Sequence, residues 1–528
     1  MFKKTFKFFR KYYLDYFLVF LLAFLTFFYI QSPPALPDPD SFYHAKMAEL
    51  TLEKGVIQDF PWAQYSTLST DYIDHHFLYH LYLSPFTRVF DPLIGAKVAT
   101  IFLDVILVLF IYFFLTHFKI KGRFFWILFL LTVNPFLFRI SLVKAPVLSI
   151  IFLLLGFYAF VNYKRWLLFW LSFFYVWAYA GWPLLWVILV LYFGVDFLYE
   201  KLHKKTIFWQ TVQIVINHVS PHKKKQKRWK LLGVITSGTI LGLVINPYFP
   251  KNIYFYYQQI YQIAVVNLQK VIGVGGEWYP YGLSNLLKDL GVMTPILVVA
   301  VIVFFISWRR QSRLSTVLFF LTLFFFAYTL KARRSVEYLA PFGLLFSAFS
   351  FSDFFKLSWL NFEMAVFKQF KWFKNVVTGA IIAVLVLIII YGFQSIASVR
   401  QDIKNGISIF YFKNAGQWLA NNTPPQTIVL HSDWDEFPML LYWSDNNYYI
   451  NGLDQTFMYN YNKNLFWQWV QITQGQKVDN FESVVKEDFK ASYVLIETTH
   501  QAMNNLFKYN QGFNLVYQDN EAYIYQAE

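Results

Sequence analysis

The chain has 528 residues, of which 57% are hydrophobic and only 15% are charged, and its formal net charge is +15. Soluble domains carry about 25% charged residues, so this composition excludes a wholly water-soluble protein and favours an integral membrane protein. Cysteine is absent, which excludes disulfides, thiolate metal sites and a cysteine nucleophile.

The first apolar stretch runs from Tyr12 to Ile30 behind a basic N-terminus. It is longer than the ~7–15 residue core of a signal peptide and exits into prolines rather than a small-residue cleavage site, so a retained span is predicted. A membrane helix needs ~20 mostly apolar residues. Eleven spans are predicted near residues 13–31, 93–116, 123–142, 146–162, 165–181, 182–199, 231–248, 290–308, 313–330, 336–353 and 375–394. The segments around 142–146 and 181–182 could be re-entrant instead.

Lysine and arginine gather in alternate loops, which is how orientation is set in a membrane. Loop 200–230 carries nine Lys/Arg against one acid, and further basic clusters lie at 119–123, 164–165, 309–313 and 368–374. These loops are predicted to lie inside, where the basic run in 200–230 would attract anionic lipid headgroups, and no nucleic-acid partner is expected. Loop 32–92 holds eight acids against three bases and is predicted to lie outside, as is loop 249–289. The chain is thus expected to be a multi-pass protein of the cell membrane with a cytoplasmic N-terminus.

The tail, residues 395–528, lacks long apolar runs. The pattern predicts helices at 411–420, 437–443, 460–474 and 498–507, strands at 427–431, 448–451 and 492–497, and a hairpin from 514–517 and 522–525. Strands that alternate with helices indicate a small α/β domain. The fold class predicted is therefore an α-helical polytopic membrane domain, residues 1–394, followed by an extracytoplasmic α/β domain.

Acids and histidines cluster in loop 32–92, namely Asp38, Asp40 and His44 after the first span and His75 and His76 further on. Two carboxylates spaced by one residue can bind a hard divalent cation or accept a proton. The histidines could add ligands or bind a phosphate. The alternative is that an outward loop is polar because it meets water and that Asp-Pro pairs mark turns.

Two other outside segments carry candidate residues. Glu277 lies in a glycine-flanked stretch before the eighth span, so its carboxylate could swing towards a site, although a glycine-rich surface loop of no chemical role is the alternative. Arg333 and Arg334 break the orientation pattern, and paired arginines suit a phosphate or carboxylate. An ion pair with Glu337 or a lipid headgroup contact would explain them equally well.

The tail adds Trp434 and Asp435, which follow its first strand. Ligand groups often lie at the carboxyl ends of strands in α/β sheets. Helix capping by Asp433 or Asp435 is the alternative, and it is compatible with a functional role.

These features occur in one order: a first span, Asp-x-Asp-x-x-Tyr-His, an outside loop with a glutamate, an arginine-bearing outer turn, and an outside α/β tail with a Trp-Asp motif. This order resembles the GT-C superfamily of membrane glycosyltransferases, and most nearly the catalytic subunit of oligosaccharyltransferase. The resemblance covers nearly the whole chain as architecture, but only four short patches as motif.

The resemblance implies roles for these residues. Asp38 or Asp40 matches the acidic motif that binds a divalent metal, Mn²⁺ or Mg²⁺, and contacts the acceptor. Glu277, in Val-Gly-Gly-Glu, is similar to the glutamate of the family pattern Thr/Ser-x-x-Glu, so the implied metal ligands are Asp38, Asp40 and Glu277. Arg333 or Arg334 resembles the arginine near the acceptor site. Trp434 and Asp435 stand where that family has Trp-Trp-Asp-Tyr-Gly, which recognises a sequon hydroxyl residue.

The sequence also departs from the family. The second acidic pair should follow an arginine after the third span, but here Arg139 is followed by Lys144-Ala-Pro146. Only one tryptophan and no glycine follow the tail pattern. Many relatives transfer sugars from polyprenyl-phosphate carriers without a metal, using an aspartate of the first loop as base. Lys144 could then bind the phosphate that a metal would otherwise neutralise, and metal dependence stays open.

The expected function is transfer of a sugar or oligosaccharide from a polyprenyl-(pyro)phosphate donor to a protein or glycan acceptor on the outer face of the membrane. A transporter is a weaker alternative, because the sequence has no internal repeat and few charged residues within spans. A non-catalytic scaffold or sensor with an external ligand-binding domain is the other alternative, although the acid-rich first loop is then unexplained.

Overall fold

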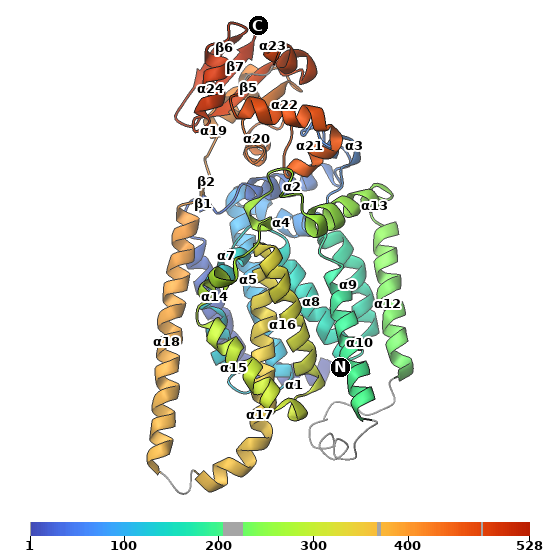
Figure 1. Ribbon diagram of the computed structural model, residues 1–528, viewed down its shortest axis with the longest axis vertical. Helices are drawn as coiled ribbons and strands as arrows, with labels where there is room; N and C mark the ends of the chain where they lie inside the picture. The colour runs from blue at the N-terminus through green and yellow to red at the C-terminus, as the bar shows by residue number, and fades with distance from the viewer. Residues whose placement is uncertain (1, 204–224, 367–370, 477–478) are drawn as a thin grey trace.

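The computed structural model describes residues 2–203, 225–366, 371–476 and 479–528. Upright helices form a bundle, and a small α/β unit lies above it (Figure 1). Most of the basic loop 200–230, namely 204–224, and the first part of the cluster 368–374, namely 368–370, lie outside the described residues.

The helices and short helical turns of the first part are α1 (Phe2–Ile30), α2 (Asp40–Lys54), α3 (Leu68–Asp71), α4 (Phe77–Val89), α5 (Pro92–His117), α6 (Arg123–Leu130), α7 (Asn134–Ile140), α8 (Pro146–Val161), α9 (Arg165–Ala178), α10 (Leu184–His203), α12 (Lys225–Val244), α13 (Lys251–Tyr256), η1 (Tyr257–Val266), η2 (Gly276–Trp278), α14 (Leu283–Asp289), α15 (Met293–Ile306), η3 (Trp308–Arg310), α16 (Arg313–Lys331), η4 (Arg333–Ser335), α17 (Val336–Val366) and α18 (Lys371–Lys404). Each of the eleven predicted spans coincides with one of these helices, or with a bent pair of them.

Judged by helix length and composition, fewer than eleven of these described segments could cross a membrane. Among the described residues, five helices are long and apolar enough to cross a membrane, and the number rises to seven if each bent pair is one span. The pairs are α6 with α7, bent by 79°, and α14 with α15, bent by 101°. Shorter apolar helices account for other predicted spans, among them α8, α10 and the described part of α12. The multi-pass helical class is confirmed, whereas the count of eleven stays a prediction.

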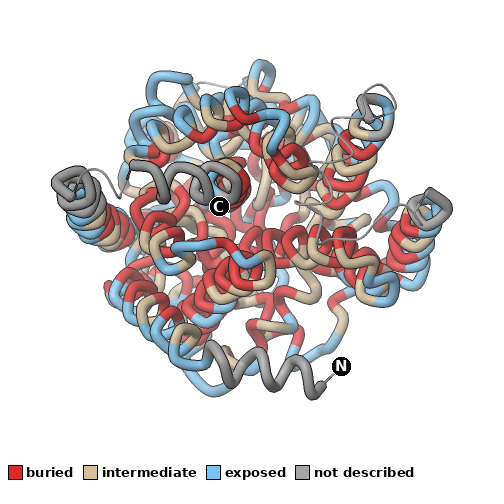
Figure 2. Tube along the Cα trace, turned by 90° about the horizontal axis from the view of Figure 1, so that it is seen from below, coloured by how far each residue is buried: buried red, intermediate tan, exposed pale blue. Residues whose placement is uncertain are grey.

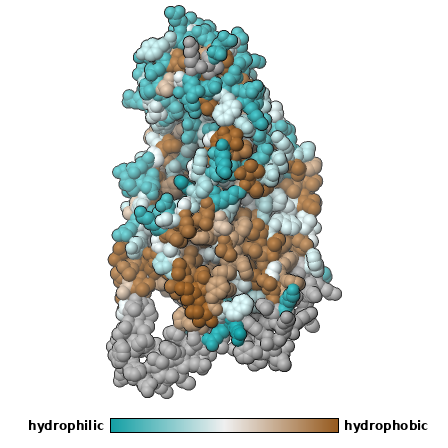
Figure 3. Space-filling model, viewed as in Figure 1, coloured by the Kyte–Doolittle hydropathy of each residue, from teal (hydrophilic) through white to brown (hydrophobic). Residues whose placement is uncertain are grey.

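The bundle is packed inside and apolar outside. Seen from below, buried residues gather towards the middle and exposed residues lie at the rim (Figure 2). Hydrophobic surface gathers over the helices, and hydrophilic surface covers the α/β unit (Figure 3). Exposed apolar side chains are numerous on α1 and α18, including Phe17, Phe28, Leu387 and Phe393. Such a belt is expected where helices face lipid.

The tail folds as an α/β unit, as predicted. Its elements are β2 (Ile407–Ser408), α19 (Lys413–Asn422), β3 (Ile428–His431), α20 (Phe437–Trp443), β4 (Tyr448–Tyr449), α21 (Gln455–Tyr461), α22 (Lys463–Thr473), α23 (Phe481–Ser483), η5 (Val484–Asp488), β5 (Tyr493–Glu497), α24 (Gln501–Lys508), β6 (Phe513–Gln518) and β7 (Ala522–Ala527). Five strands form a mixed sheet in the order β4-β3-β5-β7-β6, with β3 parallel to β4 and β5. The predicted hairpin is present as β6 and β7.

The sheet joins the helical bundle through a shared core. Because side chains alternate along a strand, Val429 and Leu495 pack into the same apolar cluster as the bundle, whereas Leu430 and Val494 pack into a second cluster with α22 and α24. On the bundle side, α20 packs against α2. The α/β unit therefore rests on the helix that begins at Asp40.

A short two-stranded ladder holds the segment that leads into α2. β1 (Ala35–Leu36) pairs antiparallel with β2, which follows α18. Lys97 of α5 donates hydrogen bonds to the carbonyls of Pro33 and Ala35, the latter at 2.7 Å. Gly406, just before β2, allows β1 and β2 to lie this close. A Cβ added to Gly406 would be only 2.3 Å from the Leu36 carbonyl oxygen.

Candidate functional site

A cavity of about 430 Å³ lies between the bundle and the α/β unit. Charged and ionisable side chains from several segments line it, among them Asp40 and His44 of α2, Lys144, Glu277 and Arg334. Its other walls are largely apolar. Cavities of ~300–1,000 Å³ with a few convergent polar groups are typical of small-molecule sites.

Lys144 lies at the centre of the charged wall. It follows α7 and precedes Pro146, the first residue of α8. Its Nζ is 2.7 Å from Asp38 Oδ2, 2.7 Å from Asp40 Oδ2 and 3.7 Å from Glu277 Oε2. The side chain is 12% exposed. One buried ammonium thus contacts all three carboxylates that the sequence singled out.

Glu277 is held by two arginines in addition to Lys144. Arg334 Nη1 donates to Glu277 Oε1 at 2.6 Å, and Arg139 Nη1 donates to Oε2 at 2.6 Å. Arg334 also donates to the Tyr179 hydroxyl at 2.8 Å and lies over the Trp278 ring, 4.4 Å from its centroid. The fork of Arg334 therefore sets the position of the Glu277 loop.

The charges shift each other's proton affinities. Burial alone would lower the pKa of the Lys144 ammonium, but Asp38, Asp40 and Glu277 together raise it. Burial alone would raise the pKa of the Glu277 carboxyl, but Arg334, Lys144 and Arg139 together hold it well below its usual range. The pKa of Asp40 is raised, chiefly by burial and secondarily by Asp38, against the attraction of Lys144. Asp40 is accordingly the most basic of these carboxylates whose pKa is displaced.

The two aspartates of the first loop have different surroundings. Asp40 lines the cavity. Asp38 instead accepts hydrogen bonds through Oδ1 from the amide and hydroxyl of Ser41, at 3.3 and 2.9 Å, and contacts Lys144 through Oδ2. Asp38 therefore holds the first turn of α2 and the ammonium.

Besides Asp38, three predicted residues do not line the cavity. Arg333 is exposed and donates to the Pro280 carbonyl at 3.2 Å, so Arg334 alone of the pair lies at the site. Trp434 lies beside the Glu277 loop: its ring is close enough to Gly275 that a Cβ added to this glycine would be 3.8 Å from the ring. Asp435 is exposed. Trp434 is thus placed beside the Glu277 loop, and neither tail residue lines the cavity.

The predicted histidines do lie at the cavity. His44, His75 and His76 line it beside Lys144 and Tyr179. The ring of His76 stacks on that of Tyr179, with centroids 5.7 Å apart. The ring of His75 contacts that of His76 at a tilt of 40°, with centroids 3.8 Å apart. Burial lowers the pKa of His75 to about 4, so this ring is neutral near pH 7.

Sequence reasoning missed several residues of the site. Arg139 joins Glu277 to Glu337, whose Oε2 accepts from Arg139 Nε at 3.0 Å. Asp454 and Phe457 bring the α/β unit to the cavity. No pattern near Arg139 or Glu337 predicts their contacts, because Arg139 lies 138 residues from Glu277 and 198 residues from Glu337 in the sequence. A helical pair, His76 with His80, could have been found from its spacing of four residues.

As arranged, the three carboxylates implied as metal ligands do not offer a free ligand set. Asp38 and Asp40 both contact Lys144, and Glu277 contacts three cations. A hard divalent cation prefers oxygen ligands without a competing ammonium between them. Asp38, Asp40 and Glu277 in this arrangement therefore do not fit a divalent cation.

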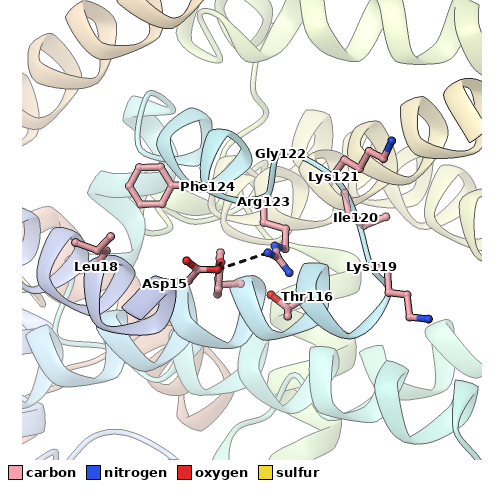
Figure 4. Close-up of a pocket in the computed structure, with 10 residues that line it drawn as sticks. Asp15, Leu18, Thr116, Lys119, Ile120, Lys121, Gly122, Arg123 and Phe124 are labelled. Atoms are coloured by element: carbon pink, nitrogen blue, oxygen red, sulfur yellow. Dashed lines mark hydrogen bonds and ion pairs between the residues drawn. The ribbon is translucent and has the colours of Figure 1, made fainter. Parts of the chain in front are cut away.

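Another hollow, of about 550 Å³, contains none of the predicted residues. It lies at the C-terminal end of α5, where Asp15 of α1 forms an ion pair with Arg123 at 3.5 Å, while Lys119 and Lys121 point away from the pair (Figure 4). Among the described residues, its lining has cations but a single carboxylate, Asp15, so it lacks a cluster of carboxylates like the one around Lys144.

Solved structures share this fold. The archaeal oligosaccharyltransferase AglB from Archaeoglobus fulgidus, in complex with an inhibitory peptide and a dolichol-phosphate, is 14% identical, with a TM-score of 0.61 over 98% of this chain and 75% of that chain. Its apo form is 13% identical, with a TM-score of 0.57 over 98% and 75%. The arabinofuranosyltransferase AftD from Mycobacteria is 12% identical, with a TM-score of 0.52 over 97% of this chain and 40% of that chain. No protein-family model and no curated protein sequence matches the chain. The resemblance to GT-C membrane glycosyltransferases is confirmed as one of fold.

Proposed function

We propose that this protein is a membrane glycosyltransferase that moves a sugar or oligosaccharide from a polyprenyl-(pyro)phosphate donor to a protein or glycan acceptor on the outer face of the membrane. The observation that carries the proposal is that Asp40, Lys144, Glu277 and Arg334 converge on one cavity between the helical bundle and the α/β unit. The fold shared with AglB and AftD supports the same class of reaction.

The cavity suits the two halves of such a donor. Arg334 and Lys144 supply positive charge for a phosphate, and guanidinium groups bind phosphate oxygens through two parallel hydrogen bonds. Leu184 and Val187 of α10 and Phe324 of α16 form an apolar wall of the same cavity. A polyprenyl chain would lie along this wall. The AglB structure that contains a dolichol-phosphate makes a lipid phosphate the natural ligand to test.

Asp40 is the proposed general base. The acceptor hydroxyl or amide attacks the anomeric carbon, its proton passes to the Asp40 carboxylate, and the bond from that carbon to the phosphate oxygen breaks. A carboxylate with a raised pKa is a better proton acceptor than an ordinary aspartate. The departing phosphate keeps both bonding electrons, and Lys144 and Arg334 stabilise its charge.

Lys144 is proposed to make this reaction independent of a divalent cation bound to the carboxylates. Its ammonium contacts Asp38 and Asp40 at 2.7 Å, where the family resemblance implied Mn²⁺ or Mg²⁺. Protein washed with a chelator should transfer sugar without added Mn²⁺ or Mg²⁺. Loss of activity that manganese restores would contradict this part of the proposal.

The decisive experiment uses the full chain in proteoliposomes supplied with polyprenyl-linked sugar donors and with peptide or glycan acceptors. The double substitution Asp38→Asn/Asp40→Asn should abolish transfer. Asp59→Asn is the matched control, because Asp59 lies in the same outer loop and is exposed. Full transfer by the double variant would refute the assigned role of the first-loop acids. If the wild-type protein consumed none of the polyprenyl-linked donors, the donor class would be refuted.

A further inference from the structure

Two buried imidazoles and one half-buried imidazole meet beside the charged wall of the cavity. His44 lies on α2, His76 immediately before α4, and His80 within α4. One ligand nitrogen from each ring can be chosen so that all three lie within 4.8 Å of one another. The spacing of four residues brings His76 and His80 to the same side of a helical turn.

A carboxylate orients one of these rings. Asp74 Oδ2 lies 2.7 Å from His80 Nδ1, and Asp74 Oδ1 accepts a hydrogen bond from the His76 amide at 3.0 Å. With Nδ1–H donating to Asp74, the lone pair of His80 is on Nε2, which lies 2.8 Å from His44 Nδ1. A carboxylate that holds one ring nitrogen while the other points at neighbouring imidazoles is the usual support for a metal-binding histidine.

His76 Nδ1 is buried and has no hydrogen-bond partner among the described residues. A buried, unpaired ring nitrogen is costly, and a metal ion is one way to satisfy it.

We propose that His44, His76 and His80 form a zinc site, with Asp74 as the residue that orients His80. Three imidazoles favour Zn²⁺ over Mg²⁺ or Mn²⁺, which prefer oxygen ligands. Tetrahedral bonds of ~2.0–2.1 Å put ligand nitrogens ~3.4 Å apart. The distance of 2.8 Å between His44 Nδ1 and His80 Nε2 must therefore open by about half an ångström. The ligand nitrogens all lie within 4.8 Å of one another, so any pair near that limit must move closer by about 1.4 Å.

The fourth ligand position of this ion would face the cavity, because His44 and His76 line it. A water molecule or a phosphate oxygen could occupy that position. The site is separate from the carboxylates around Lys144, and the zinc proposal does not depend on the proposed function. A chain that binds zinc here and transfers no sugar would support it equally.

The test measures metal directly on the full chain, purified in detergent with an affinity tag that contains no histidine. Plasma mass spectrometry should find about one zinc per chain, and Co²⁺ added to zinc-stripped protein should give the visible absorption bands of tetrahedral coordination. His76→Asn is the principal variant, because it leaves the His44–His80–Asp74 contacts in place. It should remove most of the zinc while the protein stays monodisperse.

Two further variants separate binding from folding. Asp74→Asn should weaken zinc affinity ~10–100-fold, as loss of an orienting partner does. His75→Asn should leave the metal content unchanged, because His75 is adjacent but is not one of the three rings. Substoichiometric zinc with no saturable Co²⁺ binding would overturn the proposal, as would equal loss of metal in the His75 and His76 variants.

Discussion

Replacing Lys144 with methionine removes the charge at the centre of the site while keeping a side chain of similar length. Each of the two short contacts, at 2.7 Å to Asp38 and Asp40, has a gross attraction of ~6 kcal/mol at an effective dielectric constant of ~20. Desolvation offsets much of this attraction, and breaking a buried ion pair costs ~3–5 kcal/mol. Glu277 keeps Arg139 and Arg334, so the cost falls on the two aspartates.

The expected result is a lower melting temperature in detergent and a loss of transfer of ~10²–10³-fold, the effect of removing one electrostatic stabiliser of a leaving group. Asp38→Asn added to Lys144→Met removes one of the unpaired carboxylates and should recover much of the stability, but not the transfer. This difference separates a catalytic role from a structural one. The assays are thermal unfolding and radiolabelled sugar transfer in proteoliposomes.

Lys288→Met is the control, because Lys288 is an exposed residue of α14. It should change neither stability nor transfer. If the Lys144→Met protein melted and transferred sugar like the wild type, the charge balance derived from the contacts would be wrong. If the double variant regained full transfer, Lys144 would serve only to hold the fold.

The remaining predictions concern other parts of the site. Arg334→Lys should lower transfer ~10²-fold or more, because a lysine lacks the planar fork with which Arg334 donates to both Glu277 and the Tyr179 hydroxyl. Arg333→Lys, at an exposed residue, should be nearly neutral in the same assay. Gly406→Ala should cost ~1–3 kcal/mol, because the added Cβ overlaps a β1 carbonyl; unfolding by heat checks this, with Gly379→Ala of α18, which has open space, as the comparison. Transfer should fall as the pH falls through the raised pKa of Asp40, because the protonated acid accepts no proton; a pH–rate profile should place this acid limb above pH ~4, the value for an ordinary aspartate. Lys144→Asp restores a carboxylate where the family has one and should make transfer dependent on added Mn²⁺, which titration with the metal would detect.

Local signals explain why much of the architecture could be predicted. Span helices are visible as apolar runs, and in the tail the helix 437–443 has the predicted bounds. The predicted location of Asp40, Lys144, Glu277 and Arg334 on one side of the membrane made a shared site possible. That these four side chains line one cavity is a finding of the structure.

The details that could not be predicted depend on contacts between distant segments. The bridge from Arg139 to Glu277 and Glu337 has no pattern in either neighbourhood. Neighbouring residues also diverge: Arg333 and Arg334 are adjacent on a 3₁₀ turn, so their side chains leave it in different directions, and only one enters the site. The carboxylates implied as metal ligands contact Lys144 instead, and no sequence pattern shows that this ammonium lies between them.

The shared core has a consequence for how the protein is made. Phe42 of α2 packs against Tyr442 of α20, with ring centroids 5.7 Å apart, and Phe457 of α21 lines the same cavity as Asp40. During translation, the start of α2 therefore emerges long before the segments that cover it. A chain that ends before α20 leaves an apolar face of α2 without its partner and leaves the cavity open on that side. Truncated products should be inactive and prone to degradation, and the cell gains no partly working enzyme from incomplete synthesis.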